Sequence, residues 1–306
     1  MAGLFDKRLV VVSGKGGVGK SSISAAIALA AAKAGKKTLV CEVNAKERIT
    51  LLLGHPPVGP ELTAIDGNLW AVDVRPNEAM REYALMTLRF KAVYNAVFEN
   101  RFVRYFLRFV PSLQELVMLG KILYHVKETD PDGRPRFDLV VMDAPATGHA
   151  ISYLSVPQVI IDTVPPGPMS KEAEWMRDLL VDRERTAALL VSLPEEMPVN
   201  ETLDLYAALQ KRVRVPVAAS VLNAFIEERF TDDDVAKARA QSPSLGDLVH
   251  AHKERADISK ALERKLAAGL PVPVVKVPRL YVNDFSRAAI EQIGEHLRPL
   301  LTGASA

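Results

Sequence analysis

Short runs of β-branched and aliphatic residues alternate along the chain with longer stretches of helical periodicity. This alternation is typical of βαβ units on a parallel sheet. Most of the runs lack an alternation of polar and apolar positions, as expected for strands covered by helices on both faces. The predicted strands are Leu9–Val12, Thr38–Val43, Leu69–Val74, Leu139–Met142, Leu189–Val191, Val217–Leu222 and Val272–Val277. The pattern therefore predicts an α/β protein with a mostly parallel sheet flanked by helices.

Three helical stretches stand out between the predicted strands. The alanine-rich segment Ser22–Lys33 predicts a helix that ends at Gly35. A long helical insertion covers residues 77–130, with a break at Pro111, and a second, charged helical segment covers residues 227–266. The sequence contains no internal repeat. We therefore expect residues 1–306 to form a single domain that carries the insertion and the charged segment.

The composition narrows the class of protein. Hydrophobic residues at 48% and charged residues at 25% are ordinary globular values and exclude intrinsic disorder. A net charge of +2 argues against a nucleic-acid partner, and no apolar stretch has the length of a membrane span. A single cysteine, Cys41, cannot form an internal disulfide and indicates a reducing compartment. We expect a cytoplasmic protein without stable membrane insertion.

Residues 14–21 form the glycine loop, Gly-Lys-Gly-Gly-Val-Gly-Lys-Ser, which fits the pattern G-x-x-x-x-G-K-[ST] at every fixed position. Glycines let successive backbone N–H groups converge on an anion, and the N-terminus of the following helix adds its dipole. The pattern predicts binding of ATP and Mg²⁺, with Lys20 on the β- and γ-phosphates and Ser21 on the metal. The predicted nucleotide-binding residues of this P-loop NTPase are Gly14, Lys15, Gly16, Gly17, Val18, Gly19, Lys20, Ser21 and Ser22.

One lysine of the glycine loop is additional to the general pattern. Lys15 directly follows the first glycine, and this form resembles the deviant Walker A motif of the signal-recognition-like, MinD and ParA class of ATPases. In that class the first lysine reaches the nucleotide of a partner subunit. The resemblance therefore implies a catalytic role for Lys15 in an ATP-sandwiched dimer, either a homodimer or a heterodimer with a paralogue.

A second motif indicates a branch of that class. A predicted buried strand ends in Asp143, and the tail Asp143-x-x-x-Thr147-Gly148-His149 resembles the switch II signature of the arsenical-pump ATPase (ArsA) and tail-anchored-protein targeting ATPase family. The resemblance implies that Asp143 holds Mg²⁺ through a water molecule. It also implies that Asn223 recognises adenine, and that Pro278 and Arg279 form a second loop facing the base.

The chain departs from the family pattern in switch I. Asn44 stands where the family has the aspartate that positions the attacking water. An amide can orient a water but cannot accept its proton, and a general base typically contributes ~10²–10⁴-fold. We therefore expect ATP to be bound and slowly hydrolysed. Glu42, Glu47 or a group of a partner subunit could take the place of the aspartate.

The second departure concerns cysteines. The targeting ATPases commonly carry a CxxC whose zinc bridges the dimer, but the region matching it, residues 225–266, contains no cysteine. A lone Cys41 also cannot supply the cysteine cluster that arsenite pumps use for the metalloid. We therefore expect no interfacial zinc and interpret Cys41 as a small buried hydrophobe.

The insertion contains five aromatic residues at four-residue spacing: Phe90, Tyr94, Phe98, Phe102 and Phe106. This spacing places them along one helical stripe, which could face the core of a helical subdomain or form a groove for an apolar segment. Together with the family resemblance, the interpretation as a groove predicts that the nucleotide state controls capture and release of a hydrophobic client or partner protein. The alternatives are a MinD- or ParA-like nucleotide-gated scaffold and the ATPase subunit of an anion pump.

Overall fold

The computed structural model describes residues 3–43, 49–88 and 111–303. Within these residues the strands form one eight-stranded sheet in the order β3-β4-β2-β5-β1-β6-β7-β8. All neighbouring strands are parallel except β3 and β4. The strands are β1 Leu9–Gly14, β2 Thr38–Val43, β3 Thr63–Asp66, β4 Leu69–Val74, β5 Leu139–Asp143, β6 Thr186–Ser192, β7 Val217–Phe225 and β8 Val274–Pro278. The predicted α/β fold class is confirmed.

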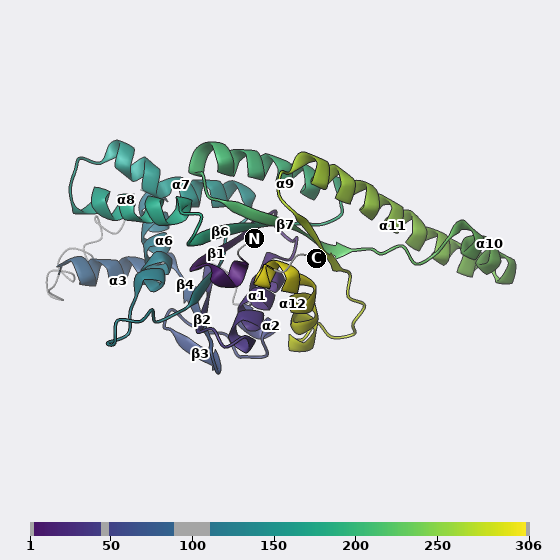
Figure 1. The fold of residues 1–306 in the computed structure, drawn as a ribbon, viewed down its shortest axis with the longest axis horizontal. Coiled ribbons are helices and arrows are strands. Elements are labelled where there is room, and N and C mark those ends of the chain that lie inside the picture. The colour runs from purple at the N-terminus through teal and green to yellow at the C-terminus, as the bar shows by residue number, and fades with distance from the viewer. Residues whose placement is uncertain (1–2, 44–48, 89–110, 304–306) are drawn as a thin grey trace.

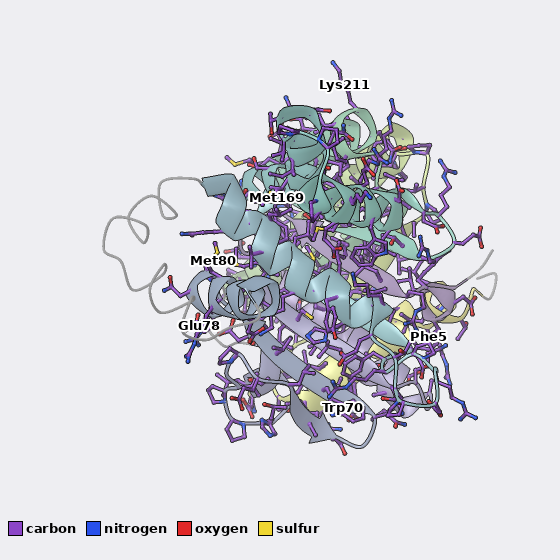
Figure 2. The ribbon with its side chains drawn as sticks, turned by 90° about the vertical axis from the view of Figure 1, so that its left-hand side faces the viewer. Phe5, Trp70, Glu78, Met80, Met169 and Lys211 are labelled. Carbon is purple, nitrogen blue, oxygen red and sulfur yellow. The ribbon has the colours of Figure 1, made fainter. Side chains whose placement is uncertain are left out.

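Helices cover both faces of the sheet (Figure 1). One face packs against α3, α6, α7, α8 and α9, and Figure 2 looks onto this helical layer, with Met80 and Met169 labelled. The other face packs against α1, α2 and α12. The bounds are α1 Lys20–Lys33, α2 Ile49–Leu52, α3 Pro76–Leu88, α6 Pro111–Lys127, α7 Thr147–Thr163, α8 Pro168–Val181, α9 Glu196–Ala208 and α12 Arg287–Thr302. A 3-10 turn, Leu4–Asp6, precedes β1, and a π turn, Leu209–Val213, follows α9.

The central strands are buried along their whole length, which explains why their sequences are apolar at successive positions. Cys41 of β2 is fully buried, as expected for a small hydrophobic residue. In the register of β1 and β5, Val12 lies opposite Asp143, so that the carboxyl ends of these strands are adjacent. In open parallel sheets this edge is where ligands bind.

The clearest differences from the predicted elements concern β3, α8 and β7. The antiparallel edge strand β3 alternates half-buried and exposed positions over four residues, too short a pattern to stand out in the sequence. The helix α8 begins at Pro168, in a segment for which no element was predicted, and proline is readily accommodated in the first turn of a helix. The strand β7 continues three residues beyond the expected Leu222, through Asn223 and Ala224.

The helix α10, Asp232–Gln241, and the first part of α11, Pro243–Gly269, form an arm that projects from the body of the molecule (Figure 1). The last part of α11 packs on the body, where Leu266 contacts the cluster that contains Val199 and Leu222. The two helices pack on each other around a small cluster of Val235, Ala238 and Val249. Among the residues that the structure describes, no helix is both long enough and apolar enough to cross a membrane.

Candidate functional site

The glycine loop joins the carboxyl end of β1 to the first turn of α1. Gly17 and Gly19 have left-handed backbone conformations, with φ of +85° and +94°, which favour glycine. A Cβ atom at Gly14 would collide with the carbonyl oxygen of Val191 in β6, whereas beyond its chain neighbours no described atom lies within 4 Å of a Cβ built at Gly17. The loop therefore leaves open space beside its backbone groups at a helix N-terminus, which suits a phosphate chain.

Asp143 lies beside this loop, with two hydroxyl groups on its carboxylate. Ser21 donates a hydrogen bond of 2.7 Å to Oδ2, and Ser24 donates one of 3.2 Å to Oδ1. The residue is 6% exposed. Burial raises the pKa of Asp143, while the Ser21 hydrogen bond and the charge of Lys20 counteract this effect. A buried carboxylate and an adjacent hydroxyl are hard oxygen ligands, and the site fits a divalent cation such as Mg²⁺.

Ser24 is not among the predicted site residues. It lies three positions after Ser21 on α1 and is fully buried. Residues three apart lie on the same face of a helix, so both hydroxyls reach one carboxylate. The signal available in the sequence is a hydroxyl group within an otherwise alanine-rich helix.

Lys20 folds back across the glycine loop. Its Nζ atom donates a hydrogen bond of 3.0 Å to the backbone oxygen of Lys15. Burial lowers the pKa of Lys20, and the charge of Asp143 counteracts this shift only in part. An anion in the loop would therefore stabilise the ammonium group further. Ser22, also predicted to bind the nucleotide, lies in the same first turn of α1.

Lys15 is paired with its own chain. Its Nζ atom lies 2.9 Å from Oε1 of Glu201 on α9, and it also contacts the sulfur atom of Met197. Met197 is 62% exposed. Glu201 is not among the predicted site residues, because which residue of α9 faces the loop depends on how that helix packs on the sheet.

Asn223 reaches the glycine loop from β7. Its Nδ2 atom donates a hydrogen bond of 3.0 Å to the backbone oxygen of Val18. Pro278 ends β8 opposite Phe225, and the backbone N–H of Arg279 donates a hydrogen bond of 2.8 Å to the oxygen of Phe225. The guanidinium of Arg279 lies 6.0 Å from the centre of the Tyr281 ring. The three predicted base-binding residues therefore come from the adjacent strands β7 and β8, and Asn223 touches the glycine loop.

Comparison with known proteins places this geometry in a family. Residues 7–165 match the family model described as anion-transporting ATPase. The chain belongs to the anion-transporting ATPase family. The matched residues include the glycine loop and Asp143, and they end shortly after α7. The resemblance to arsenical-pump and tail-anchored-targeting ATPases is thereby confirmed.

Curated members of the anion-transporting ATPase family extend the similarity. The chain is 33% identical over 255 residues to ATPase BagA of Mycobacterium tuberculosis, covering 81% of this chain and 74% of that protein. It is 22% identical over 287 residues to ATPase ASNA1 homolog 1 of Paramecium tetraurelia, covering 80% and 83%. It is 22% identical over 279 residues to ATPase ARSA1 of Chlamydomonas reinhardtii, covering 72% of this chain but 35% of that protein. Membership of this family supports nucleotide binding and ATP hydrolysis in general.

Parts of the predicted site lie outside the described residues. These are Asn44 and Glu47 of switch I, and the five aromatic residues Phe90, Tyr94, Phe98, Phe102 and Phe106. Glu42, the other acidic candidate near switch I, is buried in β2, and its Oε1 accepts a hydrogen bond of 2.8 Å from the backbone N–H of Ile49. This contact gives Glu42 a role in fixing the start of α2. His149 lies exposed in the first turn of α7.

Proposed function

We propose that this protein binds ATP with Mg²⁺ as a dimer and hydrolyses it slowly, and that its nucleotide state controls capture and release of a hydrophobic client or partner protein. The observation that carries the nucleotide proposal is the group formed by Lys20, Ser21 and Asp143 beside an open glycine loop. These side chains come from both ends of the matched family region and lie close together. They supply a positively charged ammonium group for phosphate and two oxygen ligands for a metal.

The residues of the site have distinct parts in this proposal. Lys20 pairs with the β- and γ-phosphates, whose negative charge adds to that of Asp143 in stabilising the partly buried ammonium group. Ser21 would hold Mg²⁺ directly and Asp143 would hold it through water. The 2.7 Å hydrogen bond that Ser21 donates to Asp143 keeps the two side chains together. Mg²⁺, when bound, supplies neutralisation of phosphate charge. Phosphoryl transfer depends mainly on such positioning and electrostatic stabilisation.

Slow turnover follows from Asn44 in switch I. An amide at this position orients a water without taking its proton, and general-base catalysis is worth about 10²–10⁴-fold. Because the carboxylate of Glu42 is engaged with the backbone of Ile49, Glu47 or a group of a partner subunit is the better candidate for a base.

The position of Lys15 supports the dimer. The pair of Lys15 and Glu201 is partly exposed, with 27% and 36% of the side chains accessible. Exposed ion pairs contribute about 0–1 kcal/mol, so a nucleotide held by a partner subunit could draw Lys15 away at little cost. A partner at this surface would also cover the exposed side chain of Met197.

Client control requires a connection between the nucleotide and the insertion. The helix α6 begins at Pro111, directly after the aromatic stripe, and packs against α7, whose first turn carries the switch II residue His149. The packing of α6 on α7 supports the proposal that nucleotide changes at switch II alter the client groove.

Two measurements test the proposal: the rate of ATP hydrolysis, and the molecular mass of the protein in solution with and without Mg·ATP. We expect slow turnover for the wild type and a loss of at least about 10²-fold for Lys20→Ala, because one charged donor to the phosphates is removed. The exposed Lys211 provides the matched control Lys211→Ala, which should keep wild-type turnover. Asn44→Asp should raise turnover by about 10²-fold or more, because it restores a carboxylate to switch I.

The mass measurement tests the dimer, and an ATP-dependent doubling that Lys15→Ala abolishes is the expected result. A wild type that binds no ATP at millimolar concentration would overturn the nucleotide proposal. Unchanged turnover in Asn44→Asp would show that the amide is not what limits hydrolysis, and a monomer at saturating ATP would exclude the dimer.

A further inference from the structure

Asn223 and the glycine loop are 205 residues apart in the sequence, yet the side chain of Asn223 bonds directly to the loop backbone. The family resemblance assigns this residue to recognition of the base. The contact observed here is of another kind, because its acceptor is the carbonyl oxygen of Val18, between the loop glycines Gly17 and Gly19.

The backbone of β7 aims this side chain at the loop. The pairing of β7 with β8 shifts its register between Leu222 and Phe225, and within this bulge Ala224 adopts a left-handed φ of +53°. A bulge turns a side chain away from the regular direction of its strand. Regular pairing resumes at Phe225, where Arg279 donates a backbone hydrogen bond of 2.8 Å. Asn223 is therefore held from both sides at the point where it meets the loop.

The contact fixes one peptide group of the loop. The amide nitrogen of Asn223 lies so close to Gly19 that a Cβ there would collide with it. Because a trans peptide is planar, its carbonyl and its N–H point in opposite directions. Holding the carbonyl of Val18 outward toward Asn223 therefore directs the N–H of Gly19 away from Asn223. Backbone N–H groups are what the loop offers to phosphate oxygens.

We infer that Asn223 is a positioning residue for the glycine loop, and that through Val18 it sets the affinity for the polyphosphate chain whether or not a base is attached. This inference rests on the proposed nucleotide binding. The two roles are compatible, because a side-chain amide has two N–H donors and one carbonyl acceptor, of which Val18 engages a single donor. A ligand that has phosphates and no base distinguishes loop positioning from base recognition.

The experiment compares binding of Mg·ATP and of inorganic tripolyphosphate with Mg²⁺ by titration calorimetry, for the wild type, Asn223→Ala and Ala224→Gly. For Asn223→Ala we expect about 5–10-fold weaker binding of tripolyphosphate, the value of one hydrogen bond, and at least as large a loss for ATP. Ala224→Gly is the matched control, since glycine accepts the left-handed backbone, and it should bind tripolyphosphate within about twofold of the wild type.

A second measurement reports on the loop without any ligand. Amide hydrogen exchange across residues 14–21 should be faster in Asn223→Ala than in the wild type. Asn223→Leu, which has a similar shape, no charge and no N–H donor, replaces the alanine variant if that one does not fold. Wild-type tripolyphosphate affinity together with unchanged exchange in a folded Asn223 variant would overturn the inference. A wild type that binds neither ligand would instead contradict the proposed function.

Discussion

The glycine loop and the arm each contain a glycine in close contact with another element, but the two contacts join different parts of the chain. Gly14 lies against the backbone of Val191, which belongs to a central strand far away in the sequence. Gly246 of α11 lies against Arg239 of α10, and a Cβ atom there would lie 2.6 Å from the Cβ atom of Arg239. The first contact holds the sheet together at the candidate site, whereas the second closes a local helix pair.

The surroundings of the two glycines differ in the same way. Gly14 stands between strands that are buried on both faces, in contact with the main core of the molecule. The arm has the small cluster of Val235, Ala238 and Val249, and exposed ion pairs such as Arg239 with Asp247. Such pairs contribute about 0–1 kcal/mol each. We therefore expect the site to lose order only with the whole domain, and the arm to open locally.

The largest effect is expected for Gly14→Ala. The added methyl group meets a backbone oxygen of a central strand, which cannot move without disturbing the sheet, and we expect a loss of roughly 3 kcal/mol in the free energy of unfolding. Urea denaturation monitored by far-UV circular dichroism measures it. Nucleotide binding should fall in parallel, since the first residue of the glycine loop shifts. A variant that keeps wild-type stability would show that β1 and β6 tolerate separation at this point.

Gly246→Ala should have a smaller and local effect. The methyl group pushes Arg239 and hence α10 away from α11, at a cost of about 1–2 kcal/mol confined to the arm. Amide hydrogen exchange should become faster in residues 232–255 and remain unchanged in residues 9–33. ATP turnover should equal that of the wild type. Faster exchange in both regions would mean that the arm and the sheet unfold as one unit.

The same contrast determines how much of the molecule the sequence alone could predict. The glycine loop is a continuous motif, and Asp143 closes an apolar strand, so both follow from local patterns. Ser24 required only the helical spacing from Ser21. Glu201 and the Val18 contact of Asn223 could not be predicted, because they depend on how α9 packs and on a bulge in β7. Contacts that depend on the docking of distant elements leave no local signal.

The smallest effect is expected at a buried histidine that has an exposed counterpart on the arm. His125 of α6 is buried, with Nδ1 2.9 Å from Oε2 of Glu128, and its Nε2 finds no hydrogen-bond partner among the described residues. Burial lowers the pKa of His125, and the hydrogen bond to Glu128 counteracts this shift in part. On the arm, His250 is half-exposed and lies 3.5 Å from Glu254.

Because the pKa of His125 is lower in the folded chain, the unfolded chain takes up a proton first when the pH falls below about 6.5. The stability that the neutral imidazole provides is complete above that pH and is lost during acidification. His125→Gln removes the titration and keeps a donor for Glu128, so the free energy of unfolding should fall less between pH 7 and pH 5 than in the wild type. His250→Gln, the control on the arm, should leave the free energy of unfolding at pH 7 within about 0.5 kcal/mol of the wild type, because its side chain is half-exposed. If the free energy of unfolding had the same pH dependence in the wild type and in His125→Gln, the buried imidazole would be protonated without cost. The contrast between a tightly packed body and a loosely packed arm would then not extend to His125.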